Sequence, residues 1–165
     1  IPELSTMSDD LLKQKLDSVE MMVRKYTNNN FQNRNIRFLA DSVGTILNGS
    51  SPFLVEGDTI QVSDSRVNDG LYVVKSVSDD SVVVDRPLFS VEHNLVTKVE
   101  YPADVKFGVV NLLKWDIANR DKVGIKSETI SRHSVTYFDL DSSNQVMGYP
   151  VSLLGFLESY KKARF

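Results

Sequence analysis

The sequence predicts an α+β protein in which a helical bundle, built from both chain ends, carries an inserted small antiparallel β barrel or sandwich. Two observations lead to this prediction. Apolar residues recur at helical spacing near the start of the chain and again after Pro102, whereas short runs rich in β-branched residues fill the middle. We therefore expect a discontinuous helical domain of residues 1–35 and 102–165, and an inserted β domain of residues 36–101.

The first expected helix lies in "STMSDDLLKQKLDSVEMMVRKYTNNN". Ser8 is suited to cap its start, and Asp9 and Asp10 follow where the helix dipole favours acidic residues. The run of asparagines that begins at Asn28 is suited to end it, because Asn tolerates the left-handed conformation. The expected buried stripe consists of Leu12, Leu16, Val19, Val23 and Tyr26.

The middle of the chain reads as short strands in "DTIQVSDS", "LYVVKSVS", "SVVVDRPL" and "LVTKVEY". Asn68-Asp69-Gly70 predicts a hairpin between the first two, and Asp79-Asp80 predicts another between the next two. Residues 36–101 hold ten acidic and five basic residues, so this segment carries a net charge of −5.

Helical spacing returns in "PADVKFGVVNLLKWDIANRDK". One face carries Ala103, Phe107, Val110, Leu113 and Ile117, whereas Trp115 lies off that stripe. A helix with apolar residues on two sides either lies deep or meets a second partner. "GIKSETISRHSVTYFDL" then alternates as an extended segment or hairpin arm, and a last helix is expected from about Val151 to Lys161.

Composition excludes several classes of protein. The chain has no cysteine, which excludes disulfides and thiolate metal sites. No apolar run is long enough to span a bilayer and no signal-peptide pattern is found. We therefore expect no membrane segment, and a setting in the cytosol or in an assembly built there. No block has the dense basic character of a general nucleic-acid binder.

The sequence shows none of the common catalytic patterns, so we predict that the protein is not an enzyme. His93 and His133 are forty residues apart, and neither has a second ligand at metal spacing. No Gly-x-Ser-x-Gly turn, Walker loop or dinucleotide fingerprint is present. "DLDSSN" begins like a calcium loop but lacks the required Gly and the closing Glu. We expect neither a metal nor another cofactor.

Two stretches instead have the character of interaction surfaces. "NNNFQNRNIRF" interleaves amides, arginines and phenylalanines, and Phe31, Arg34 and Arg37, together with Arg24, suit a protein–protein contact. An ordinary loop is the alternative. "ESYKKARF" carries the same signature more strongly, with a tail folded along its own bundle as the alternative.

Three stretches in order carry a resemblance to a known family: "VEMMVRKYTNNNFQNRN", "YPADVKFGVVNLLKWDIANRDKVGIKSETISRHSVTYFD" and "GYPVSLLGFLESYKKARF". Together they resemble the head–tail connector proteins of long-tailed bacteriophages, also called adaptor or head-completion proteins. The resemblance covers both helical flanks, and its most specific part is "KSETISRHSVTYF" followed by a helix that ends in Tyr-Lys-Lys-x-Arg-Phe. The large β insertion departs from shorter members of the family.

The resemblance implies a structural virion protein that catalyses nothing. Such proteins form a ring, typically dodecameric, between the capsid portal and the tail or next neck component, and DNA passes through their channel without specific binding. The implied location is the neck of the virion, reached from the host cytoplasm. The family's C-terminal segment engages the portal, which here corresponds to Tyr160, Lys161, Lys162, Arg164 and Phe165.

Further contacts to neighbouring copies or to the neck are expected in the "SETISRHSVTYF" stretch, which is suited to strand pairing between subunits. The residues concerned are Glu128, Ser131, Arg132 and Tyr137. The alternative function is a free-standing binding module whose β domain recognises a small ligand, an oligosaccharide or single-stranded nucleic acid. The acidic middle, without clustered bases and aromatics, disfavours nucleic acid.

Overall fold

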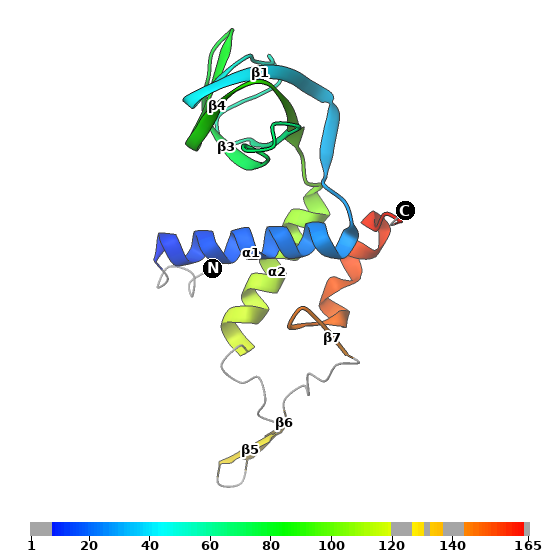
Figure 1. Cartoon of the computed structure of the whole chain (residues 1–165). Helices are drawn as coiled ribbons and strands as arrows, with labels where there is room; N and C mark the ends of the chain where they lie inside the picture. The colour runs from blue at the N-terminus through cyan, green and yellow to red at the C-terminus, as the bar shows by residue number, and fades with distance from the viewer. Residues whose placement is uncertain (1–7, 120–126, 131–132, 137–143, 164–165) are drawn as a thin grey trace. The chain divides into compact units, whose positions relative to one another are not determined.

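The computed structural model describes residues 8–119, 127–130, 133–136 and 144–163 and has a mixed α+β fold (Figure 1). The chain divides into two compact units. The helical unit comprises Ile1–Asn29 and Pro102–Phe165, and the β unit comprises Asn30–Tyr101. The boundary thus falls six residues before the predicted one at residue 36, because the first strand already begins at Gln32.

Helix α1 spans Asp9–Thr27, and its ends follow the sequence prediction. The Ser8 side chain accepts a hydrogen bond from the Leu11 amide at 3.3 Å and so caps the first turn. Asn28 ends the helix in the left-handed conformation with φ 50°. Of the predicted stripe, Val19 and Val23 are buried, whereas Leu16 remains 41% exposed.

Helix α2 spans Ala103–Asn119 and buries a different face from the one predicted. Phe107, expected inside, is 65% exposed, and Ala103 is exposed as well. The buried side is formed instead by Val105, Gly108, Leu112, Leu113 and Asp116, of which only Leu113 belonged to the predicted stripe.

Gly108 explains which side of α2 packs against the final helix. The 3₁₀ helix η3 spans Val151–Tyr160, buries Leu154 and Leu157, and places Phe156 against α2. A Cβ atom built on Gly108 would lie only 2.3 Å from Cε2 of Phe156. The two helices can therefore approach this closely only because residue 108 has no side chain.

Ionic and aromatic contacts add to the packing of the helical unit. Lys15 of α1 pairs with the buried carboxylate of Asp116 at 2.5 Å. The Trp115 ring lies 5.7 Å from that of Tyr149, measured between centroids. Tyr149 belongs to a short hairpin of β7, Gln145–Val146, and β8, Tyr149–Pro150, which leads directly into η3.

The predicted extended arm after α2 forms an antiparallel hairpin. Strand β5, Ser127–Ile130, pairs with β6, His133–Thr136, so that Glu128 lies opposite Val135. Within the described residues this is a two-stranded sheet.

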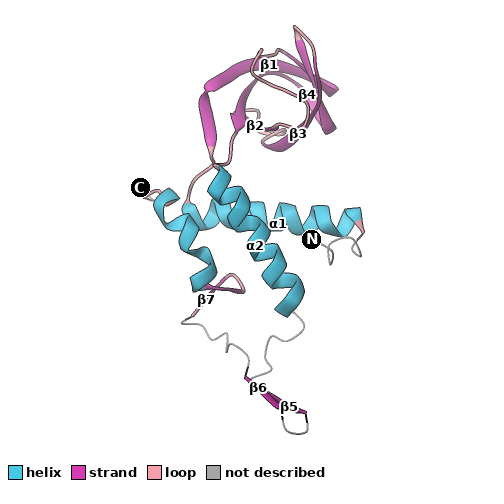
Figure 2. Ribbon diagram, turned by 180° about the vertical axis from the view of Figure 1, so that it is seen from behind, coloured by secondary structure: helices cyan, strands magenta, loops and turns pink. Residues whose placement is uncertain are grey.

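The β unit contains four strands, shown as long bent ribbons for β1 and β4 in Figure 2. They are β1, Gln32–Asn48; β2, Thr59–Ser63; β3, Gly70–Val77; and β4, Ser81–Val99. All pairs are antiparallel, in the order β1-β4-β2-β3 with a further β3–β4 pairing. Both predicted hairpins are confirmed, because β2 pairs with β3 and β3 pairs with β4.

The sheet is not closed into a barrel, so the barrel prediction is wrong, and the four strands form one sheet, not the two facing sheets of a sandwich. The predicted strands "SVVVDRPL" and "LVTKVEY" are the two halves of β4, because the residues between them keep pairing with β1. The β1–β4 register shifts four times along this ladder. Such irregularities bend strands, which lets a single sheet curve around its own core.

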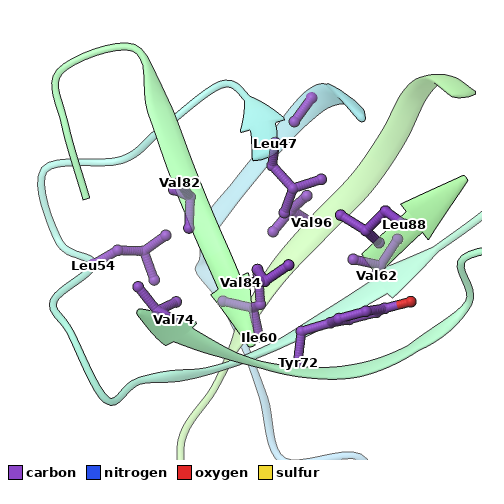
Figure 3. Close-up of a cluster of buried hydrophobic side chains, with 11 residues drawn as sticks. Leu47, Leu54, Ile60, Val62, Tyr72, Val74, Val82, Val84, Leu88 and Val96 are labelled. Atoms are coloured by element: carbon purple, nitrogen blue, oxygen red, sulfur yellow. The ribbon is translucent and has the colours of Figure 1, made fainter. Parts of the chain in front are cut away.

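That core consists of aliphatic side chains from all four strands, with Tyr72 at one side (Figure 3). A buried polar network lies where the β1–β4 register is irregular. The Asn68 amide donates to the Phe89 carbonyl at 2.9 Å, and its oxygen accepts from the Phe89 amide at 2.8 Å. Asn94 donates to the Ala40 carbonyl at 2.9 Å. These side chains therefore supply bonds that the interrupted ladder lacks.

Candidate functional site: the C-terminal tip

The C-terminal tip, residues 160–165, begins against the end of α1, which the sequence places more than a hundred residues earlier. The Lys162 amide donates to the Thr27 carbonyl at 2.8 Å. The Asn28 side chain donates to the Ala163 carbonyl at 3.0 Å, and that of Asn29 donates to the Tyr160 carbonyl at 3.2 Å. Figure 1 shows η3 ending beside this end of α1.

Residues 26–29, which we call the seat, owe this role to the way α1 ends. The last carbonyls of a helix have no partner within the helix, so they are free to accept bonds from another segment. The left-handed turn at Asn28 redirects the chain, and the Asn28 and Asn29 amides can then donate to the tip's carbonyls. The seat thus fixes the backbone of the tip up to Ala163.

Side chains reinforce this attachment. The Tyr160 hydroxyl donates to both carboxylate oxygens of Asp104 on α2, each at 2.8 Å. Glu158 accepts from the Tyr26 hydroxyl at 2.6 Å and from the Lys161 amine at 2.8 Å. The Lys161 amine also lies 4.1 Å from the centroid of the Tyr26 ring, as a cation–π contact.

The ionisation of these groups is shifted by the same contacts. The hydrogen bond from Lys161, followed by that from Tyr26, lowers the pKa of Glu158 below its ordinary value. The hydrogen bond to Glu158 raises the pKa of Lys161, and the hydrogen bond to Asp104 raises the pKa of Tyr160. All three groups are exposed at the surface, so solvent screens these interactions.

The predicted portal-binding residues differ in the contacts that they make with their own chain. Tyr160 and Lys161 make contacts within their own chain, as described above. Lys162 binds the seat through its backbone, and its side chain is exposed. Arg164 and Phe165 lie outside the described residues. The chain therefore holds the base of the predicted anchor in place.

The other predicted interface residues are distributed over both units. Arg24 lies in the last turn of α1 and is buried. Phe31 is also buried, with its ring centroid 4.8 Å from that of Tyr101. Arg34 and Arg37 are exposed on β1, where the Arg37 guanidinium donates to the Thr97 hydroxyl at 2.9 Å.

In the hairpin, Glu128 belongs to β5. Ser131, Arg132 and Tyr137 lie outside the described residues. "NNNFQNRNIRF", for which an ordinary loop was the alternative, forms the start of β1 from Gln32 onward. Its phenylalanines face different surroundings, because Phe31 packs on Tyr101 whereas Phe38 is partly buried against the sheet's core.

Sequence analysis missed the seat and the two carboxylates, Asp104 and Glu158, that hold the tip. A signal was present, because three consecutive asparagines at a helix end provide more side-chain amides than a helix stop needs. Their partners are separated from them by more than a hundred residues, however, and no local pattern identifies such pairs.

Among the described residues, no group of three or more His, Asp or Glu side chains could hold a metal ion. His93 is exposed and has a left-handed backbone, with its amide donating to the Asp41 carboxylate at 2.8 Å. None of the described helices is both long and apolar enough to cross a membrane.

Comparison of the chain with models of protein families, with curated proteins and with solved structures finds no match.

Proposed function

We propose that this protein is a ring-forming connector of the bacteriophage neck, situated between the capsid portal and the tail or next neck component. In this role the helical unit acts as a bundle built from both chain ends, and the tip is its portal anchor. DNA passes through the ring's channel without specific binding. The protein is a structural component and acts without a cofactor.

One observation supports this proposal above the others, namely the attachment of the tip to the seat. A short segment that follows the last packed helix ordinarily frays unless something holds it. Here two asparagine side chains and a helix carbonyl bind the backbone of residues 160–163. The cation Lys162 lies on this fixed base, and a second cation and an aromatic residue, Arg164 and Phe165, follow it within three residues of the sequence.

A fixed base suits an anchor in a ring. A segment that must order upon binding pays conformational entropy at that moment, and attachment of its first residues lowers this cost. Repetition around a ring makes each further anchor nearly an intramolecular event, so weak individual contacts suffice for stable attachment.

The experiment is a binding assay between the purified chain and its cognate portal protein. We expect deletion of residues 164–165, or Lys162→Glu, to weaken binding at least about tenfold, because the cationic and aromatic anchor groups are lost. Both changes leave the contacts of Tyr160 and Lys161 in place. Lys75→Glu, at an exposed position on β3, is the matched control and should bind like the unaltered chain. Equal portal binding by all four proteins would show that the anchor lies elsewhere.

A further inference from the structure

Helix α2 presents an apolar face that the described part of the chain leaves uncovered. Ala103, Phe107 and Val110 follow one another at helical spacing, and Phe107 is 65% exposed. The sequence pattern marks this face for burial, yet the helical unit buries the opposite side. Two exposed lysines, Lys106 and Lys114, and one exposed carboxylate, Asp104, lie next to the face. The uncovered face is therefore apolar with a border of net positive charge.

The first half of α1 carries a second surface that no described residue covers. The stripe that is buried at Val19 and Val23 continues toward the N-terminus as Leu12 and Leu16, but Leu16 is 41% exposed there. Leu11, in the first turn of α1, is 46% exposed. The same turns carry three exposed carboxylates, those of Asp9, Asp10 and Asp17, and one exposed lysine, Lys13. This surface is therefore apolar with a net negative charge.

The two surfaces of one chain cannot cover each other. Lys15 of α1 pairs with Asp116 on the buried side of α2. Phe107 and Asp116 are nine residues apart, which puts them on opposite sides of a helix with about 3.6 residues per turn. An α1 that is held at Asp116 thus lies on the wrong side of α2 to reach Phe107.

We propose that a second copy of this chain covers the Phe107 face of α2 with the Leu16 surface of its α1. Leucines then meet Phe107 and Val110, and carboxylates meet lysines. This inference rests on the proposed ring function and names its subunit contact. The contact joins two different surfaces of identical chains, and such a heterologous contact repeats from copy to copy until the ring closes.

Disulfide trapping tests this contact, since the chain has no cysteine of its own. In the double variant Leu16→Cys/Phe107→Cys, oxidation should yield a ladder of linked dimers, trimers and larger species on non-reducing gels. A mixture of the two single variants should yield dimers only. The matched control is Ser18→Cys/Phe107→Cys, because residue 18 is exposed but lies on the far side of the same turns from Leu16. It should form several-fold less linked product.

Charge reversal tests the complementarity separately. Lys106→Glu/Lys114→Glu in the Phe107→Cys partner should reduce the dimer yield several-fold. Asp9→Lys/Asp17→Lys in the Leu16→Cys partner should restore it. A yield that ignores both changes would contradict the electrostatic part of the contact.

Other outcomes overturn the inference. Dimers from one single variant alone would mean a symmetric contact, and a disulfide within one chain would mean that the chain covers its own face. The trapping is run on the free chain and on the portal-bound chain, and absence of a ladder in both also overturns it. Portal binding without a ladder leaves the proposed function intact and refutes the contact. A ladder from a chain that does not bind the portal supports the subunit contact and refutes the proposed portal-binding function.

Discussion

Gly108 and Gly155 lie on helices that contact each other, yet a side chain would meet different surroundings at the two positions. A Cβ at Gly108 would lie 2.3 Å from the Phe156 ring, whereas a Cβ at Gly155 would have no heavy atom within 4 Å. We expect Gly108→Ala to lower the free energy of unfolding by about 1–3 kcal/mol, because the close packing of α2 on η3 must open. Gly155→Ala should leave it unchanged or raise it slightly.

Urea unfolding followed by tryptophan fluorescence measures this difference. Trp115 is the sole tryptophan and lies in α2 within the helical unit, so its emission reports that unit. Phe156→Leu should recover part of the loss in the Gly108→Ala background, since it removes the ring that the new methyl group meets. Equal stability of the two alanine variants would refute the packing role of Gly108.

Asn28 combines a backbone role and a side-chain role, and two substitutions separate them. It ends α1 with φ 50°, and its amide holds the Ala163 carbonyl. Asn28→Gly keeps the left-handed turn but should free the tip, with little change in unfolding. Asn28→Ala should free the tip and also destabilise α1 by about 1 kcal/mol, because alanine is strained in that conformation.

Amide hydrogen exchange of residues 161–163 provides the readout for the tip, and tryptophan fluorescence provides it for the helical unit. If the tip of the Asn28→Gly variant is as protected from exchange as that of the unaltered chain, the Asn28 side chain is not what holds the tip.

At the scale of elements, the attachment of the tip should depend on pH. The pKa of Glu158 is lowered in the folded chain. The stabilisation that Glu158 gives to the attached tip is therefore fully present above the ordinary glutamate pKa of about 4.3, and it is lost as the pH falls through the lower pKa of the folded state. The pKa values of Lys161 and Tyr160 are raised in the folded chain. The stabilisation that these two residues give to the attached tip is therefore fully present below about pH 10, and it is lost as the pH rises through the higher pKa values of the folded state. The tip should be held best between about pH 5 and 10.

An NMR titration from about pH 6 to 3 tests the acidic limit, with the Lys162 amide signal as the reporter because that amide donates to Thr27. The signal should move toward its position in an unattached tail as Glu158 gains a proton. Glu158→Gln is the control and should abolish this step. A step that persists unchanged in Glu158→Gln would assign the titration to another group.

The elements differ in how far the sequence determines them. Ser8 and Asn28 act through their immediate neighbours, so both ends of α1 could be predicted from local pattern. The buried face of α2 could not, because Phe107 is more apolar than Gly108, and the absence of a side chain is what selects the packed side. The full length of β4 could not be predicted, because polar residues interrupt its apolar pattern. Among them, Asn94 is buried through hydrogen bonds to residues that lie more than fifty positions earlier in the sequence.

The candidate site was predictable to a similar extent. The composition of "ESYKKARF" marked the tip as an interaction segment, and the structure shows the first residues of that tip bound by the seat. The seat itself depends on which helix end η3 approaches, which is a property of the fold and not of any short stretch of sequence.

At the scale of the whole molecule, the chain combines a helical unit that has two complementary surfaces uncovered by the described residues, a tip held at its base, and an inserted acidic β unit. The first two are what a subunit of a portal-bound ring needs, namely a contact to each neighbour and an anchor. The net charge of −5 over residues 36–101 would repel DNA wherever these residues face a channel, which favours passage without binding.

The most direct test of the central claim is light scattering on the purified chain, alone and mixed with its cognate portal protein. The account predicts a complex whose mass corresponds to the portal with a full ring of this chain, and loss of that complex when residues 164–165 are deleted. A strict monomer that leaves the mass of the portal unchanged would contradict the account and direct attention to the β unit as a ligand-binding module.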